Sequence, residues 1–447
     1  MKSSSGGGRR RRVVLVPYPF QGHLTPMLQL GSILHEKGFS ITVAHTEFNS
    51  PKPSNYPNFN FLALSDNVDG HDTSFHNLLN VMSAMNTNCE PSFQEHMVRM
   101  LDDDDDDVAC VIYDNIMKFV DVVAKRLHLP TILLRTTSAA FMHSHLALFR
   151  LAAQNSIPLP ESELEVPVPN VPPLRFKDLP LRATEEIPEA VEEFLQSYMN
   201  IRSSSAVIWN TVESLDEWPL QQLQQHWPLP FFTIGPFHKM SPPLPTSLME
   251  EDTICLSWLD KRAPNSVIYV SLGSMAIIGE EELHELAWGL AKSEQPFLWV
   301  VRPSLLNGSD AMGSLPEGFK NLVGERGLIV KWAPQKKVLA HSAVGGFLSH
   351  CGWNSTLESL CEGVPMVCRP CFADQLVNAR YLTHVWRVGV GLEKSVESAV
   401  STLMSSDCGR EMRERAVGMK LEIESAMKLG GSSSDSLDQL VKFIVSL

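Results

Sequence analysis

Residues 344–362 read VGGFLSHCGWNSTLESLCE, an apolar run followed directly by an amphipathic stretch. The run has the composition of a buried strand, and apolar residues then recur at helical spacing, at Leu357, Leu360 and Cys361. Three polar side chains fall on a different face from that apolar stripe: Asn354, Ser355 and Glu358. The sequence therefore predicts a strand that turns into a helix over 354–362, with polar groups outside the core at the helix start.

Short apolar runs alternate with amphipathic stretches along the rest of the chain. The predicted strands are 12–19, 39–46, 58–64, 108–114, 131–136, 206–211 and 231–236, then 266–274, 296–302, 327–334, 344–350 and 364–370. The predicted helices include 24–38, 280–293, 374–386, 410–428 and 434–446. This alternation favours the α/β class with doubly wound parallel sheets.

A chain of 447 residues exceeds the roughly 250 to 300 residues at which a single core stops growing, so we expect two domains. The stretch 237–252 is rich in proline and polar residues and is typical of a linker. The predicted divisions are a flexible tail at 1–11, a first domain at 12–236, the linker at 237–252, a second domain at 253–428, and a C-terminal helix within 429–447 that packs on the first domain.

A formal net charge of −14 argues against a nucleic-acid partner, because such proteins need a positive field to neutralise phosphates. No stretch approaches the roughly 18 consecutive apolar residues of a membrane span. The basic start of the chain is followed by an apolar run of residues 13–16 only, short of the roughly 7 to 15 residues in a signal peptide. We therefore expect a cytoplasmic protein without a membrane span, and a monomer.

The eight cysteines show no disulfide-framework pattern. Cys368 and Cys371 have the spacing of a redox pair, but they follow a buried-strand pattern and no second CxxC exists to complete a zinc site. Free structural thiols are therefore the favoured interpretation, and they fit a reducing compartment.

Polar residues follow the first and fourth predicted strands, at the edge where open α/β sheets bind ligands. His23 lies in a glycine-containing loop after the first strand, and its imidazole can accept a proton from a substrate hydroxyl. Asp114 ends the fourth strand. It is either the N-cap of the next helix or, if the two strands are neighbours, the group that fixes the tautomer of His23. No GxSxG elbow occurs, so a base acting on an external nucleophile fits better than a hydrolase.

The helix start at 354 favours a diphosphate, because free backbone N–H groups and the positive end of the helix dipole meet there. His350, Asn354 and Ser355 can add donors, and Glu358 can accept from a ribose diol. A capping box formed by Ser355 and Glu358 satisfies the same spacing, although it leaves His350 and Trp353 unexplained.

Other phosphate and metal patterns are weak. No GxGxxG opens a βαβ unit and no GxxxxGK[ST] occurs, which argues against a dinucleotide dehydrogenase or a P-loop enzyme. The aspartate run at 102–107 contains a formal DxD, but such a run repels itself and is typical of a solvated loop. We expect no metal and no cofactor.

The segment 332–375, WAPQKKVLAHSAVGGFLSHCGWNSTLESLCEGVPMVCRPCFADQ, closely resembles the signature box of plant UDP-sugar-dependent glycosyltransferases. The resemblance extends through PFQGHLTPMLQL, YDNIMKF and VIYVSLGS and covers nearly the whole chain. Within that family the chain is most similar to the branch that includes steviol glycoside and cytokinin glucosyltransferases.

The resemblance implies a GT-B fold, in which two Rossmann-like domains face each other across a cleft. The second domain would bind the UDP-sugar and the first a small-molecule acceptor. The implied donor residues are Trp332, Ala333 and Gln335 near uracil, Ser274, His350, Asn354 and Ser355 at the diphosphate, Glu358 at the ribose, and Trp353, Asp374 and Gln375 at the sugar. A glutamine at the end of the box goes with glucose in this family, so Gln375 favours UDP-glucose. Ala373 departs from the glycine that often precedes the final Asp-Gln, a change that could crowd the sugar slightly.

The resemblance also implies that His23 is the catalytic base and Asp114 its supporting acid, in an inverting transfer that needs no metal. Further contacts to donor or acceptor are expected from Gly22, Thr137, His143 and His145, although core or surface roles fit the two histidines equally well. The acceptor pocket would be built from loops within 74–90, 137–149 and 180–200. The alternatives are another GT-B nucleotide-sugar enzyme, such as an epimerase or hydrolase, or a UDP-sugar-binding protein without turnover.

Overall fold

The computed structural model describes residues 11–68, 77–103, 107–154, 156–201, 203–243, 247–306, 311–392 and 394–447. These residues form two compact units. Unit 1 contains the chain up to Thr136, Pro188–Leu248 and Met427–Leu447, and unit 2 contains Thr137–Ile187 and Met249–Ala426. Among the described helices, none is long and apolar enough to cross a membrane.

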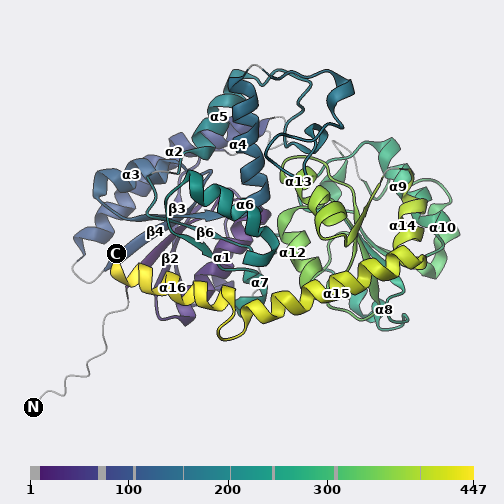
Figure 1. Ribbon diagram of the computed structural model, residues 1–447. Coiled ribbons are helices and arrows are strands. Elements are labelled where there is room, and N and C mark those ends of the chain that lie inside the picture. Colours follow the sequence, from purple (N-terminus) through teal and green to yellow (C-terminus); the bar gives the residue numbers. More distant parts are fainter. Residues whose placement is uncertain are drawn as a thin grey trace, which may run out of the picture. The chain divides into compact units, whose positions relative to one another are not determined.

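Unit 1 is built on one parallel sheet, of which β2, β3, β4 and β6 are labelled in Figure 1. Its described strands run in the order β3-β2-β1-β4-β5-β6-β7. The strands are β1 (Arg12–Val16), β2 (Ser40–Thr46), β3 (Phe59–Leu64), β4 (Val108–Asp114), β5 (Thr131–Arg135), β6 (Ala206–Trp209) and β7 (Phe231–Thr233). Its helices are α1 (Gln21–Glu36), α2 (Leu78–Asp102), α3 (Phe119–Leu127), α5 (Glu189–Met199), α6 (Glu213–His226), α7 (Phe237–Met240) and α16 (Ser432–Ser446). Buried apolar strands covered by helices are the expected pattern for a parallel sheet.

Unit 2 repeats this design with a second parallel sheet, in the order β10-β9-β8-β11-β12-β13. Its strands are β8 (Val267–Ser271), β9 (Phe297–Val300), β10 (Gly327–Val330), β11 (Val344–Ser349), β12 (Met366–Cys368) and β13 (Gly389–Gly391). Its helices are α4 (Ala139–Ala153), α8 (Ile254–Leu259), α9 (Glu280–Lys292), α10 (Phe319–Val323), α11 (Gln335–Leu339), α12 (Trp353–Glu362), α13 (Asp374–Arg380) and α14 (Val396–Ser405), and α15 (Asp407–Met427) ends where unit 2 ends. The prediction of two doubly wound parallel sheets is confirmed.

Each predicted strand segment contains one observed strand. The short β13 escaped prediction because its sequence, Gly389–Gly391, offers no apolar run longer than one valine. Three predicted helix starts were two or three residues late: α1 begins at Gln21 rather than 24, α15 at Asp407 rather than 410, and α16 at Ser432 rather than 434. In each case the first turn is mostly polar, and apolar periodicity cannot detect it. The predicted helix 374–386 is α13 followed by a π-helical turn at Tyr381–Val385.

The bounds of the two units differ from the predicted domain boundaries chiefly in two places. Residues 137–187 belong to unit 2, where α13 packs on α4 and the Arg380 guanidinium donates to the carbonyl of Pro173, 3.0 Å away. The predicted linker 237–252 contributes α7 to unit 1, where that helix packs on α1. Side-chain contacts between distant segments, which composition does not report, explain both differences.

The last helix of the chain lies in unit 1, where α16, yellow in Figure 1, packs against β7 and β4. Leu437, Leu440 and Ile444 enter the same buried cluster as residues of β1 and α1. At the start of β1, Nη1 of Arg11 donates to the carbonyls of Ile444 and Val445 at 2.9 and 3.0 Å.

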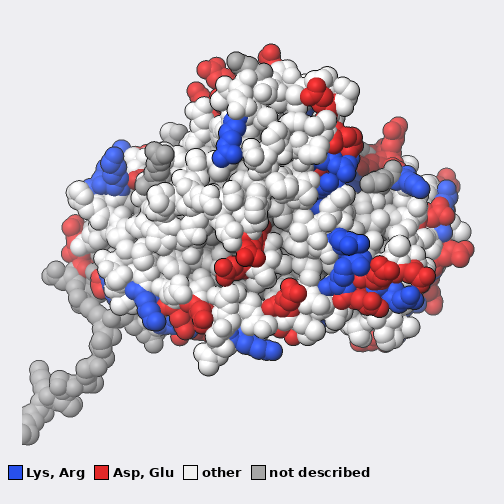
Figure 2. Space-filling view, in the orientation of Figure 1, with Lys and Arg blue, Asp and Glu red and all other residues white. Residues whose placement is uncertain are grey.

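Charged side chains are mixed over the visible surface. Figure 2 shows blue and red groups side by side over α15, where Arg410 pairs with Asp407 and Arg415 with Glu411. Paired surface charges create little long-range field, so any phosphate must be held by local groups.

Leu440→Ala should lower the free energy of unfolding of unit 1 by about 2–5 kcal/mol, because Leu440 is fully buried and its loss leaves a cavity. Urea denaturation, with hydrogen exchange of β7 as a local probe, measures the effect. Leu429→Ala is the matched control, since Leu429 is 95% exposed and should change stability little. Equal effects from the two variants would show that α16 does not stabilise the unit.

Candidate functional site

Each sheet has a point at which the order of its strands reverses, and polar residues gather there. In unit 1 the point lies between β1 and β4, which pair in parallel with Val16 beside Tyr113. In unit 2 it lies between β8 and β11, with Ser271 beside Ser349. Crevices at such points, beyond the carboxyl ends of the strands, are where open α/β sheets bind ligands.

His23 follows β1 but lies in the first turn of α1, not in the loop that was predicted. Phe20 is the N-cap residue, and its carbonyl accepts from the backbone N–H of His23 at 2.8 Å. Nε2 of Gln21 donates to Oγ1 of Thr25 at 2.7 Å, which helps to fix this first turn. The helix therefore holds His23 beside the end of β1.

Asp114 ends β4, as predicted, and reaches His23. Its Oδ2 lies 2.8 Å from Nδ1 of His23, and the side chains are 3% and 24% exposed respectively. Oδ1 of the same carboxylate accepts from the backbone N–H of Ile116 at 3.0 Å. The alternative role as a helix N-cap is wrong, because α3 begins at Phe119 with Lys118 as its N-cap.

This geometry determines the chemistry available to the imidazole. An ionised carboxylate only accepts hydrogen bonds, so the proton of His23 resides on Nδ1 and Nε2 is the basic atom. The Tyr18 ring packs edge-on to the imidazole, with ring centroids 5.3 Å apart. Burial, and secondarily the charge of Asp114, raises the pKa of Tyr18, so its phenol remains neutral. The pair can act as a base with a fixed tautomer.

In unit 2, α12 begins at Trp353, and its N-cap is Gly352, which has no side chain that could cap the helix. Ser355 is therefore the third residue of the helix, and the capping box proposed for Ser355 and Glu358 is not formed. Instead, Nε2 of Gln335 donates to Oγ of Ser355 at 2.9 Å and to Oε2 of Glu358 at 2.7 Å. Gln335, the first residue of α11, therefore links Ser355, which was predicted at the diphosphate, to Glu358, which was predicted at the ribose.

His350 lies between two glycines at this edge. A Cβ added at Gly273 or at Gly352 would come within 2.5 Å of Nε2 of the ring, so glycine alone lets both segments close on it. Burial, and secondarily the charge of Arg302, lowers the pKa of His350 to about 4. The ring is therefore neutral at pH 7 and offers one N–H donor rather than a charge.

Arg302 was missed by the sequence analysis, although it follows β9 at the same edge. It is 3% exposed, its Nε donates to the carbonyl of Gly273 at 3.0 Å, and its Nη1 donates to the carbonyl of Ser304 at 2.7 Å. Burial lowers its pKa to about 10, so the guanidinium stays charged at pH 7. A buried positive charge beside the loop after β8 favours an anion nearby.

The predicted sugar residues form two sets of hydrogen bonds at the start of α13. Oδ2 of Asp374 accepts from the backbone N–H of Trp353 at 3.2 Å and from Nδ2 of Asn378 at 2.8 Å. Oε1 of Gln375 accepts from the backbone N–H groups of Cys371 and Phe372 at 2.8 and 3.1 Å. The carbonyl end of Gln375 therefore orders the loop, and its amide nitrogen is the end suited to a sugar oxygen.

Ala373 has a strained backbone conformation, which was not predicted from the sequence. Its φ is +54° and its ψ is −128°, a combination that glycine adopts freely and that costs an L-residue roughly 1–3 kcal/mol. The alanine in place of glycine therefore introduces backbone strain just before Asp374, in addition to any crowding of the sugar by its methyl group.

The remaining predicted residues are dispersed. Ser274 follows β8, Ala333 is buried beside a partly exposed Trp332, Asn354 is partly exposed in the first turn of α12, and Gly22 is exposed in the first turn of α1. Oγ1 of Thr137 is buried without a partner among the described residues. His143 and His145 are both 3% exposed within α4, a core position. Residues 74–76 of the expected acceptor loops, and Asp104–Asp106 of the aspartate run, lie outside the described part of the chain.

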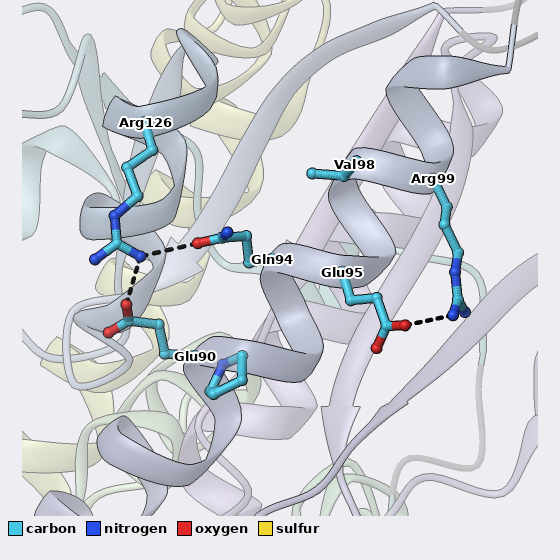
Figure 3. Close-up of a pocket in the computed structure, with 7 residues that line it drawn as sticks. Glu90, Gln94, Glu95, Val98, Arg99 and Arg126 are labelled. Atoms are coloured by element: carbon cyan, nitrogen blue, oxygen red, sulfur yellow. Dashed lines mark hydrogen bonds and ion pairs between the residues drawn. The ribbon is translucent and has the colours of Figure 1, made fainter.

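A shallow pocket on α2 and α3 is a separate feature (Figure 3). Its charged groups neutralise one another: Arg126 pairs with Glu90 at 2.7 Å and Arg99 with Glu95. Since these groups satisfy each other on the surface, we place the candidate site at the two strand edges instead.

The model of the family described as UDP-glucoronosyl and UDP-glucosyl transferase matches residues 31–407. The chain belongs to this family. A tomato (Solanum lycopersicum) protein named UDP-glycosyltransferase 76E1 is 51% identical over 97% of this chain and 92% of its own length. An Arabidopsis thaliana protein named flavonol 3-O-glucosyltransferase UGT76E12 is 45% identical over 97% of both chains.

Solved structures agree with the sequence relatives. Phytolacca americana UGT2, complexed with UDP-2fluoro-glucose and pterostilbene, superposes with a TM-score of 0.84 at 27% identity, covering 97% of this chain and 100% of that one. The fold of this UDP-glycosyltransferase is therefore GT-B, with two doubly wound α/β units.

Gly352→Ala should weaken UDP binding at least tenfold, about 1.4 kcal/mol, because the new methyl group displaces the His350 ring. Isothermal titration calorimetry with UDP measures the change. Gly279→Ala is the matched control: Gly279 is also an N-cap glycine, and a Cβ there would meet no atom within 4 Å. Unchanged affinity in Gly352→Ala would remove His350 from the donor site.

Proposed function

We propose that this UDP-glycosyltransferase is an inverting glucosyltransferase that transfers glucose from UDP-glucose to a small lipophilic plant metabolite. The acceptor atom is a hydroxyl oxygen or an amine nitrogen, and terpenoids, flavonoids and other phenolics are the acceptor classes proposed. The observation that carries the proposal is the 2.8 Å contact between Nδ1 of His23 and the buried Asp114 carboxylate.

In the proposed reaction, Nε2 of His23 takes the proton of the acceptor hydroxyl. The oxygen then attacks the anomeric carbon from the face opposite UDP, and the bond from that carbon to the diphosphate oxygen breaks with its electron pair. The configuration inverts because attack and departure occur on opposite faces. Asp114 stabilises the imidazolium that forms, without taking its proton.

On the donor side, we propose that the start of α12 binds the diphosphate. The helix dipole and the neutral donor His350 favour the negative charge that develops as UDP leaves. Ser274, Asn354 and Ser355 add hydrogen bonds, and Glu358 holds the ribose. Trp332 stacks on uracil beside the backbone of Ala333, and Gln335 keeps Ser355 and Glu358 in place.

The choice of glucose rests on Gln375 and on the relatives. The Arabidopsis thaliana relative is named as a glucosyltransferase acting on a flavonol. The Phytolacca americana structure contains a fluoroglucose nucleotide and a stilbene. We propose the same donor sugar and a related phenolic or terpenoid acceptor for this chain.

One screen tests donor and acceptor together. Recombinant protein is incubated with UDP-glucose, UDP-galactose or UDP-glucuronic acid and a panel of terpenoid, flavonoid and N-heterocyclic acceptors, and the products are identified by mass spectrometry. Glucosides should form fastest. Faster transfer from another UDP-sugar, or hydrolysis of UDP-glucose without a glycoside, would contradict the proposal.

The proposed site of action is the cytoplasm, where the protein would work as a monomer. In support, all eight cysteines are free thiols, and all but two of them are buried. Such thiols suit a reducing compartment.

His23→Ala should lower kcat by at least a thousandfold and leave the affinity for UDP within twofold of the wild type, since the base does not hold the donor. Asp114→Asn should lower kcat to a similar extent, because the asparagine amide can donate to Nδ1 and so favour the wrong tautomer of His23. Steady-state kinetics with UDP titrations separate the effects. Full activity in His23→Ala would refute its role as base.

Treatment with EDTA should leave the rate unchanged, because helix-end donors and neutral side chains take the place of a metal at the diphosphate. The rate is measured before and after chelation and again after adding magnesium. Strong inhibition that magnesium reverses would show metal dependence and direct attention to the aspartate run.

A further inference from the structure

Thr136 contacts the same atom of His23 as Asp114 does. Its Oγ1 lies 3.0 Å from Nδ1 of His23, and the residue is 7% exposed. Two oxygen atoms from different strand ends, at 2.8 Å and 3.0 Å, therefore converge on a single ring nitrogen. From the sequence, a contact to donor or acceptor was expected from the neighbouring Thr137, and none from Thr136.

The position of the Thr136 hydroxyl is fixed by the backbone at the end of β5. Thr136 follows the last residue of β5, and β5 pairs with β4 so that Leu134 lies beside Asp114. The carbonyl of Arg135 accepts from the backbone N–H of Asn210 at 3.2 Å, which ties the end of β5 to the segment after β6. The end of β5 that carries the hydroxyl is therefore fixed by β4 on one side and by the segment after β6 on the other.

The identity of the proton donor follows from the chemistry of the three groups. When Asp114 is ionised, Nδ1 carries the proton, and both Oδ2 and Oγ1 of Thr136 lie within range to accept it. If the imidazole adopted the opposite tautomer, Nδ1 would be an acceptor facing a carboxylate, which repels its lone pair. When Nδ1 carries the proton, the Thr136 hydroxyl oxygen can accept a hydrogen bond from it. This second contact restrains rotation of the ring.

We propose that Thr136 is a positioning residue for the base: its hydroxyl is a second acceptor for Nδ1–H of His23 and holds the ring with Nε2 directed to the acceptor substrate. The proposal rests on the proposed role of His23 as base. Thr136 takes no proton and touches no reacting atom, so it acts only through His23.

The test compares Thr136→Val, which keeps the shape and removes the hydroxyl, with Thr136→Ser, which keeps the hydroxyl. Thr136→Val should lower kcat roughly two- to tenfold, the worth of one net hydrogen bond, with KM for both substrates within twofold of the wild type. Thr136→Ser should recover most of the lost rate. Thr131→Val is the matched control, because it removes a buried threonine hydroxyl from the other end of β5 and should leave kcat unchanged.

A spectroscopic measurement separates positioning from a loss of structure. In protein labelled with ¹⁵N-histidine, with the His23 signals identified by their absence in His23→Ala, the wild type should show a protonated Nδ1. Thr136→Val should shift or broaden that signal, and Thr136→Ser should restore it. If Thr136→Val fails to fold, Thr136→Ala and Thr136→Ser provide the same comparison.

The outcomes distinguish this inference from the function on which it rests. Equal kcat in Thr136→Val and wild type, an effect confined to KM, or an equal loss in Thr131→Val would overturn the role of Thr136. Absence of glycosyl transfer in the wild type, or full transfer in His23→Ala, would instead refute the proposed function. In that case the ¹⁵N signals would still report whether the Thr136 hydroxyl restrains the ring.

Discussion

Parallel strand pairing is the constraint on which both halves of the molecule depend. Because β1 and β4 pair in parallel, the residues after one strand and at the end of the other share an edge. The same holds for β8 and β11 in the second unit. The backbone pairing of the strands therefore determines which side chains lie within contact distance of one another. His23 and Asp114 are 91 positions apart in sequence, yet the pairing brings them into contact.

The strands and the chemical groups at their ends could be predicted from the sequence, because a buried parallel strand is a continuous apolar run and its end is where polarity begins. His23 and Asp114 were found in this way. Helix starts were predicted late, since the first turn of α1 is polar and carries no apolar period. Thr136 and Gln335 could not be assigned their contacts, because the sequence does not show which neighbour on another element a short polar side chain will touch.

Several side chains of the second unit stabilise the loops, and the same side chains are proposed to bind the sugar donor. Gln335 bonds to Ser355 and Glu358, and the carbonyl end of Gln375 orders the loop before α13. Structural and binding roles are therefore not alternatives at this edge. A substitution there changes the shape of the loop together with its chemistry, so a change in donor preference requires compensating changes nearby. The strained backbone of Ala373 adds to that coupling.

The first unit is assembled from three separate stretches of the chain, the last of which contains α16. Translation therefore completes the whole second unit before the first has received its final helix. Until that helix leaves the ribosome, the apolar faces of β4 and β7 that it covers stay open to water and to other nascent chains. The unit that is begun first is thus the unit whose last helix is made last, and it is the unit that holds His23, the proposed base.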